Sequence, residues 1–312
     1  MKCLVSGATG YIGRHLCQQL LARGDSVIAL SKSGASLPDG TPTQAVDLAL
    51  APPAKALFEG VDVVFHLAGI AHQKADAQAY RIVNEQATLQ LARRAAASGV
   101  SDFIFLSSVK AMGPANTDLE RKESDCSAAT DPYGWSKWSA ENGLLAEFSQ
   151  GPMAVVIVRP ALVYGPAAKG NLALLARGVR AGLPRPPALG ARSMVSLGDL
   201  VALLCTLSCE SRPGVRTFIA TDGQHYSTRY VYEQLRLAVG KDTGVAWLPA
   251  FGWRLAAALL DLRRGQRGET TFEKLFGTEL YSNAAALAGT SWRPQQQLKD
   301  LAGAMMQTGV RQ

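Results

Sequence analysis

The first half of the chain alternates short apolar runs with amphipathic stretches. Residues 11–23 and a stretch ending at Ser98 repeat apolar positions at the spacing of a helix. Strands that are apolar on both faces and separated by helices are typical of a parallel sheet covered on both sides. The pattern therefore predicts an α/β fold, a doubly wound Rossmann sheet, over residues 1–166. The apolar runs that we expect to form its strands are 2–5, 26–30, 61–67, 102–106 and 154–158.

The rhythm changes after Pro166. Helical patterns at 172–180 and 230–239 mix with proline-rich connections such as 184–187. We expect residues 167–312 to form mostly a smaller C-terminal substrate-binding lobe, with one strand near 215–220 that returns to the main sheet. A length of 312 residues suits one large domain with such a lobe.

Composition narrows the class of protein. Hydrophobic residues make up 47% and charged residues 18%, which allows a large core. No apolar run reaches the roughly 18 residues of a membrane span, and the apolar start of the chain leads into a glycine-rich turn instead of a signal-peptide cleavage site. Five cysteines without C-x-x-C spacing and only four histidines predict no metal site and a reduced, cytoplasmic protein.

The charge of the chain points to a small acidic ligand rather than to a nucleic acid. The net charge is +7, but the Lys and Arg residues are scattered and carry no interleaved aromatic pattern. A mildly basic surface around an acidic small substrate explains this charge more simply.

A glycine motif of the form G-x-x-G-x-x-G joins the first predicted strand to the first predicted helix. Its glycines are Gly7, Gly10 and Gly13, and Tyr11 and Ile12 begin the helix. Glycines at these places permit a tight turn and let a pyrophosphate approach the helix N-terminus. Glycine also collects in ordinary turns, but the placement between strand and helix favours a dinucleotide site.

The end of the second predicted strand bears on the choice of cofactor. An acidic residue there would bind the adenosine ribose and favour NAD, but this chain has Ser31, followed by Lys32 and Ser33. These residues tolerate a 2′-phosphate, so we expect NADP or NAD, with NADP favoured. The alternative for Lys32 is a solvated loop charge. Asp47 and Leu48 follow a third strand, where we expect contact with the adenine.

Candidate chemistry lies at the start of a predicted helix and at the end of a predicted strand. Tyr133 and Lys137 are four residues apart and share one helix face. A phenol with a pKa near ~10 exchanges protons poorly at neutral pH, and a nearby ammonium lowers that pKa. Ser107 and Ser108 follow the strand 102–106, where ligands of parallel sheets bind. Their hydroxyls are expected to orient a substrate oxygen, although such a pair can also cap a loop.

These motifs resemble those of the extended short-chain dehydrogenases/reductases, the NAD-dependent epimerase/dehydratase family, along nearly the whole chain. The resemblance is closer still to bacterial C4 keto-reductases that make UDP-N-acetyl-quinovosamine or fucosamine for surface polysaccharides. The pieces that carry the resemblance are Gly7–Gly13, His66–Gly69, Asn84, Ser107–Ser108, 131–137, Arg159–Pro166, 169–172, 192–195 and 198–200.

The resemblance implies a role for each matching residue. Tyr133 would be the general acid/base, Lys137 would hold the nicotinamide ribose and tune Tyr133, and Ser108 would hold the reacting sugar hydroxyl. Arg192 would contact the diphosphate, for which a planar guanidinium is suited, and Asn171 would lie near it. Arg192 and Asn171 can also be ordinary surface residues. The cofactor-binding residues implied by the match further include Leu67, Ala68, Gly69 and Pro160.

Departures from the family's patterns narrow the reaction. The dehydratases place Asp and Glu where this chain has Val109 and Lys110, so dehydration is not expected. The epimerases often have Asn at the place of Leu162 and Lys at the place of Ala71, which weakens an epimerase assignment without removing it.

The leading hypothesis is an NAD(P)-dependent nucleotide-sugar oxidoreductase acting at hexose C4. Its expected reaction is reduction of a UDP-4-keto-(6-deoxy)-N-acetylhexosamine for surface polysaccharide synthesis. The alternatives are a UDP-hexose 4-epimerase and, from another class, a non-catalytic NAD(P)-sensing protein on the same fold. Intact Tyr133, Lys137 and Ser108 argue against the sensor. A homodimer remains open.

Residues 251–267 combine an apolar body with a basic end. One interpretation is a helix that rests on a membrane surface. The favoured interpretation is a helix of the lobe whose arginines complement its C-terminus.

Overall fold

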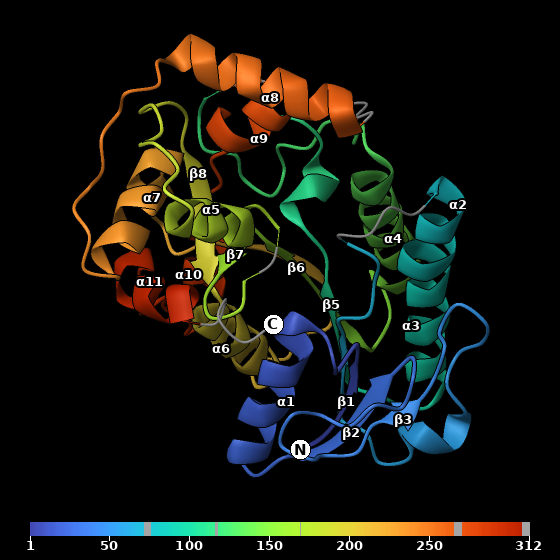
Figure 1. Ribbon diagram of the computed structural model, residues 1–312. Helices are drawn as coiled ribbons and strands as arrows, with labels where there is room; N and C mark the ends of the chain where they lie inside the picture. The colour runs from blue at the N-terminus through green and yellow to red at the C-terminus, as the bar shows by residue number, and fades with distance from the viewer. Residues whose placement is uncertain (72–75, 116–117, 169, 265–269, 308–312) are drawn as a thin grey trace.

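The computed structural model describes residues 1–71, 76–115, 118–168, 170–264 and 270–307. Within them, seven parallel strands form the main sheet in the order β3-β2-β1-β4-β5-β6-β9 (Figure 1). This order confirms the predicted α/β fold with a Rossmann sheet. The strands are β1 (Lys2–Ser6), β2 (Ser26–Ser31), β3 (Gln44–Ala45), β4 (Val63–His66), β5 (Asp102–Leu106), β6 (Ala154–Pro160) and β9 (Gly214–Ala220).

The central strands are apolar on both faces because helices cover both faces of the sheet. Every residue of β4, β5 and β6 is buried. One core, which includes Leu16 and Leu204, lies under α1 and α6, and a second, which includes Leu91 and Leu144, lies under α3 and α4. Figure 1 shows these helix pairs on opposite sides of the sheet. The helices around the sheet are α1 (Tyr11–Ala22), η1 (Lys55–Phe58), α2 (Ala77–Tyr80), η2 (Arg81–Gln86), α3 (Ala87–Ala97), η3 (Val109–Met112), α4 (Pro132–Phe148), α6 (Leu197–Leu207) and α10 (Ala284–Gly289).

A smaller lobe is built around a second sheet, in which β8 pairs in parallel with β7 and antiparallel with β10. Its own core joins residues of α5, α7 and α11, among them Val179, Leu235 and Met305. The elements of the lobe are β7 (Leu162–Tyr164), α5 (Asn171–Arg180), β8 (Arg192–Ser196), β10 (His225–Tyr226), α7 (Thr228–Leu237), α8 (Ala250–Arg264), α9 (Thr271–Phe276) and α11 (Leu298–Gln307).

The chain after residue 166 contributes to both parts of the molecule. Strand β9 lies beside β6, with Ala154 opposite Gly214 and Pro160 opposite Ala220. Helix α6 packs against α1 on one face of the main sheet. One part of the lobe, with β7, α5 and β8, therefore lies in the chain between two strands that are neighbours in the main sheet, and the rest of the lobe follows β9.

A buried polar cluster fastens the lobe to the sheet. Asp222 follows β9 and accepts hydrogen bonds from the hydroxyls of Tyr164 and Tyr226, each at 2.7 Å. Burial of its carboxyl group raises the pKa of Asp222. Of the helices that the structure describes, none combines the length and the hydropathy that a membrane span requires.

Candidate active site

The glycine motif forms a turn that only small residues can occupy. Gly7 has φ +71°, and a Cβ there would lie 2.6 Å from the backbone nitrogen of Ala68. A Cβ on Gly13 would lie 2.2 Å from the carbonyl oxygen of Gly7. Gly10 is the N-cap of α1 and supplies no side-chain cap, so the first N–H groups of the helix remain available for an anion.

The loop after β4 lies against this turn and against α4. Asn84 holds the loop: its Oδ1 accepts the backbone N–H of Ile70 at 2.8 Å, and its Nδ2 donates to the Ile70 carbonyl and to Ser136 Oγ at 3.0 Å each. A Cβ on Gly69 would lie 3.4 Å from Lys137 Nζ. Asn84 thus brings the predicted cofactor loop next to Lys137, and it sits in the π-helix η2, a type of distortion frequent at functional sites.

At the end of β2 the predicted ribose-binding residues are held by local contacts. The Ser31 hydroxyl is buried, accepts the backbone N–H of Gly34 and is hydrogen-bonded to Thr43. Lys32 is exposed and pairs with Asp47 at 3.1 Å, which lowers the pKa of that carboxyl. The side chain of Leu48 packs in the core. Lys32 is therefore the cation that a phosphate could reach, in competition with Asp47.

Tyr133 and Ser108 meet at the carboxyl end of β5. Tyr133 is in the first turn of α4, which begins at Pro132 and is capped by Asp131 through the backbone N–H of Gly134. The Ser108 hydroxyl lies near the phenol of Tyr133. Burial raises the pKa of Tyr133 to about 12, and the Ser108 hydroxyl only partly opposes this effect.

Lys137 lies one turn further along α4 and is buried. Its Nζ donates to the carbonyl oxygen of Leu106 at 2.9 Å and lies 4.6 Å from the ring centre of Phe105. Burial lowers the pKa of Lys137 to about 8, while Glu141 acts to raise it. The expected lowering of the phenol pKa by Lys137 is not seen, because burial dominates at Tyr133.

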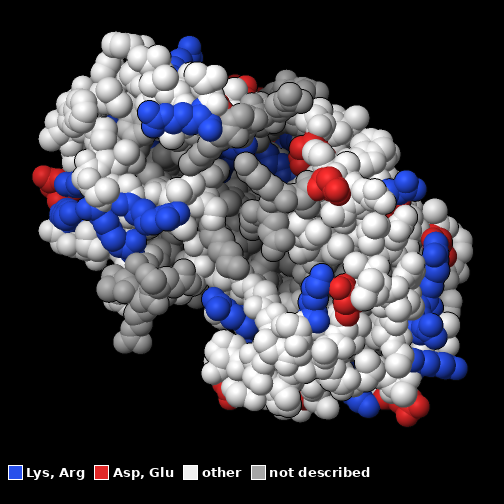
Figure 2. Space-filling model, turned by 45° about the vertical axis from the view of Figure 1, so that its right-hand side comes forward, with Lys and Arg blue, Asp and Glu red and all other residues white. Residues whose placement is uncertain are grey.

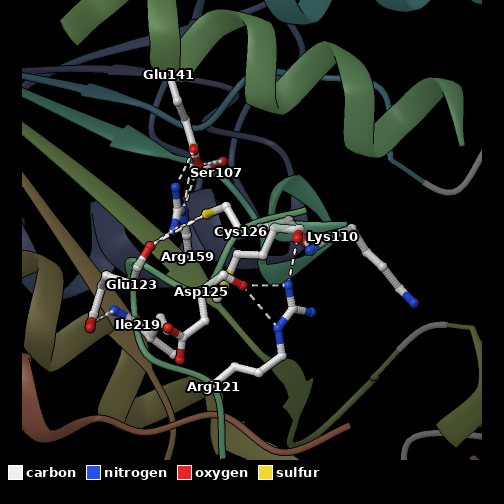
Figure 3. Close-up of polar contacts among 11 residues, drawn as sticks. Ser107, Lys110, Arg121, Glu123, Asp125, Cys126, Glu141, Arg159 and Ile219 are labelled. Carbon is white, nitrogen blue, oxygen red and sulfur yellow. Dashed lines mark hydrogen bonds and ion pairs between the residues drawn. The ribbon is translucent and has the colours of Figure 1, made fainter. Parts of the chain in front are cut away.

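The two serines after β5 differ in their partners. The Ser107 hydroxyl is buried and donates to the carboxylate of Glu141 at 2.5 Å. Ser107 thus contacts Glu141, whereas Ser108 lies near Tyr133. Arg159 of β6 binds the same carboxylate through two nitrogens, at 2.7 and 3.0 Å (Figure 3). Ser107 is thus part of a buried network that ties α4 to β5 and β6. Sequence reasoning missed this network, although Glu141 stands four residues after Lys137.

Arg192, predicted to bind a diphosphate, begins β8 and shares a carboxylate with Lys110. Arg192 Nη1 lies 3.1 Å from Glu279, and Lys110 Nζ lies 2.8 Å from the other oxygen of Glu279. Although burial opposes them, these cations hold the pKa of Glu279 below its usual range. Figure 2 shows the molecule hollowed between its two parts, with Lys or Arg side chains at the wall.

Two further predicted site residues, Asn171 and Pro160, complete the set. Asn171 is exposed and begins α5, while its neighbour Lys169 lies outside the described residues. Pro160 ends β6 at the same sheet edge as Ser6 and Leu106.

The residues present fit a dinucleotide cofactor. The turn at Gly7 leaves no room for a Cβ, and α1 begins without a side-chain cap. The Tyr11 hydroxyl at this helix start is buried and, within the described ranges, has no hydrogen-bond partner. Gly7 to Gly13 would hold the pyrophosphate, and Lys137, beside Gly69, would hold the nicotinamide ribose. His66 is not a candidate for catalysis, because burial lowers its pKa to about 3 and Ser6 and Thr88 occupy its nitrogens.

Comparisons with known proteins agree with this arrangement. The model of the NAD dependent epimerase/dehydratase family matches residues 3–203. A UDP-glucose 4-epimerase of Vibrio cholerae is 31% identical over 95% of this chain and 92% of its own. A dTDP-6-deoxy-L-talose 4-dehydrogenase (NAD(P)(+)) of Kitasatospora kifunensis is 30% identical over 80% of this chain and 82% of its own.

Solved structures share the fold. The UDP-glucose 4-epimerase of Thermotoga maritima, determined with UDP-glucose, has a TM-score of 0.77 at 19% identity and covers 99% of this chain and 98% of its own. The Thermus thermophilus UDP-glucose 4-epimerase complexed with NAD has a TM-score of 0.75 at 23% identity, with coverage of 99% and 98%. The matched family and its assembled Tyr/Lys/Ser site do not support the sensor hypothesis. The chain belongs to the NAD dependent epimerase/dehydratase family, and it is an NAD-dependent enzyme.

Proposed function

We propose that this enzyme oxidises or reduces C4 of the hexose in a nucleotide sugar, and that its net reaction is the reduction of a 4-keto sugar. The observation that carries the proposal is the grouping of Ser108, Tyr133 and Lys137 at the carboxyl end of β5, where buried Lys137 donates to the Leu106 carbonyl one helix turn after Tyr133. Two hydroxyls that meet at the carboxyl end of β5 can both contact one substrate oxygen.

Each side chain has a distinct part in the chemistry. The nicotinamide ring, when bound, supplies the hydride that adds to the C4 carbonyl carbon. Tyr133 donates its phenolic proton to the carbonyl oxygen, which becomes the C4 hydroxyl, and solvent later returns a proton to the phenolate. Ser108 orients that oxygen through its own hydroxyl. Lys137 would bind the nicotinamide ribose.

Tyr133 is in the protonation state that a reduction requires. Burial raises its pKa to about 12, so the phenol carries its proton at neutral pH and can donate it.

Cofactor choice follows from the end of β2. We infer that the enzyme accepts NADPH as well as NADH, because exposed Lys32 directly follows Ser31, where a carboxylate would repel a 2′-phosphate. A reductase must also exchange its cofactor in each turnover.

The second candidate is a UDP-hexose 4-epimerase. The Vibrio cholerae relative, which is 31% identical, carries that name. The same Tyr133, Lys137 and Ser108 would serve, but the cofactor would stay bound and return its hydride to the sugar.

One experiment separates the two reactions. The enzyme is incubated with a UDP-4-keto-6-deoxy-N-acetylhexosamine and NADPH or NADH, and in parallel with UDP-hexoses alone, and nucleotide released from the denatured protein is measured. Reduction of the keto sugar with consumption of added cofactor supports the reductase. Stoichiometric bound NAD together with UDP-hexose interconversion would overturn it and leave the epimerase.

A further inference from the structure

Helix α8 presents an apolar stripe to solvent. Phe251, Leu255, Leu259 and Leu262 are 74%, 61%, 53% and 80% exposed. Their spacing of four, four and three residues places them along one side of the helix. Isolated exposed leucines are ordinary, but a continuous row of large apolar side chains on one helix face marks a surface that another phase or molecule covers.

The opposite side of α8 makes the contacts that hold the helix on the lobe. Trp253 and Ala257 are buried against the lobe, and the Trp253 ring meets Phe276 of α9 edge-on at 5.7 Å. The carboxylate of Asp261 accepts the backbone N–H of Thr271, at the start of α9, at 2.9 Å. The exposed stripe is thus additional to the contacts that hold α8 in place.

The apolar surface continues into the segment before the helix. Val245 and Trp247 are also largely exposed. The stripe on α8 and these two residues together are called the α8 patch. In Figure 1, α8 lies along the outer edge of the lobe, above α9.

The described charged side chains that α8 exposes are positive. Arg254 is exposed next to the stripe, and its guanidinium lies 5.0 Å from the ring centre of Phe272, which holds it at the helix surface. Arg263 is exposed near the end of the helix. The acidic side chain within α8, Asp261, is turned toward α9. Of the sequence-predicted stretch 251–267, residues 265–267 lie outside the described residues.

We propose that the α8 patch docks the enzyme onto the surface of an anionic phospholipid membrane. Large apolar side chains on one helix face, with arginines beside them and the carboxylate turned away, are the chemistry of a helix that lies in the plane of a membrane interface. The apolar stripe enters the headgroup and acyl boundary, while Arg254 and Arg263 contact lipid phosphates. Docking of this kind is peripheral and reversible, and it does not depend on the identity of the sugar substrate.

The test is flotation of the full-length protein with vesicles of pure phosphatidylcholine or of phosphatidylcholine with phosphatidylglycerol. We expect the protein to float with the anionic vesicles at low salt and less so as salt is raised. The double variant Leu255→Glu/Leu259→Glu should lose at least tenfold of this binding. Leu50→Glu, at a leucine that is even more exposed and remote from α8, is the control and should bind as the wild type does.

Two further measurements keep the result interpretable. Circular dichroism and thermal melting of the double variant must match the wild type, because both substituted side chains are exposed. Wild-type protein that stays unbound with anionic vesicles, or a Leu50 variant that loses binding equally, overturns the proposal. A third outcome would assign the α8 patch to a second copy of the chain instead. In it, the wild type does not bind vesicles but is a dimer in light scattering, and the double variant is a monomer.

Discussion

The guanidinium of Arg192 lies 3.1 Å from the carboxylate of Glu279, although the two residues are 87 positions apart in the chain. The same carboxylate holds Lys110. The cation proposed to bind the substrate diphosphate is therefore positioned by an acid from a distant segment of the chain.

Arg192→Leu is expected to raise the KM for a nucleotide sugar by at least tenfold with little change in kcat. A charge-assisted hydrogen bond contributes about 1.5–3 kcal/mol, and the diphosphate is remote from the reacting carbon. Steady-state kinetics measure the split. Arg185→Leu is the control, because Arg185 is also an ion-paired arginine of the lobe, bound to Glu233. Loss of turnover at saturating substrate would instead assign Arg192 to the chemistry or to folding.

Tyr133→Phe is expected to lower kcat by several orders of magnitude while cofactor binding persists, because only the transferred proton is lost. Turnover and cofactor titration by fluorescence give the two quantities. Tyr230→Phe, at an exposed tyrosine of α7, should be silent. Activity of the Tyr133 variant within tenfold of wild type would remove Tyr133 from the mechanism.

Lys32→Ala is expected to lower kcat/KM for NADPH by roughly tenfold, as one charged hydrogen bond to phosphate is lost. The kcat/KM for NADH should hardly change, because NADH lacks the 2′-phosphate. Asp47→Asn frees Lys32 from its partner and should shift preference further toward NADPH. An equal loss of kcat/KM with NADPH and with NADH would show that Lys32 does not bind the 2′-phosphate.

Activity is expected to fall as pH rises through about 8. Burial lowers the pKa of Lys137 to about 8, so the ammonium that holds the ribose is present below that pH and lost above it. Tyr133, with a pKa raised to about 12, keeps its proton throughout this window. A profile of kcat/KM for the cofactor from pH 6 to 10 tests the assignment. A Lys137→Arg variant that retains activity should lack the alkaline fall, whereas the same fall in that variant would point to another group.

Arg159→Ala is expected to cost about 3–5 kcal/mol of unfolding free energy, because it leaves the Glu141 carboxylate buried without its cation. Arg93→Ala is the matched control. Arg93 of α3 pairs with Glu147, which lies on α4 as Glu141 does but at the surface. A surface pair of this kind contributes about 0–1 kcal/mol. Chemical denaturation measures both losses. Similar small losses in the two variants would contradict a stabilising role for the buried pair.

The strands of the main sheet were predictable because burial on both faces leaves continuous apolar runs. Residues 102–106, for example, form β5 with the predicted bounds. The strands β7, β8 and β10 were not expected. They are two to five residues long, and β10 (His225–Tyr226) has no apolar run at all.

Side-chain partners were harder to predict than elements. The sequence treats Ser107 and Ser108 alike, yet successive residues at a strand end point to different sides, and only Ser108 meets Tyr133. Glu279 reaches Arg192 from a distant segment, and no local pattern records that contact. Likewise, the pKa of Tyr133 depends on how deeply the whole fold buries it, which the spacing to Lys137 does not reveal.

The pairing of β6 with β9 has a consequence for how the chain is made. On the ribosome, β6 emerges with one side unprotected, and its partner follows only after β7, α5, β8 and α6 have been synthesised. At ~5–20 residues per second this interval lasts several seconds. During that time the nascent chain carries the open edge of a largely apolar strand, a feature prone to pairing with a wrong neighbour. A fragment ending near residue 166 would keep this edge open permanently.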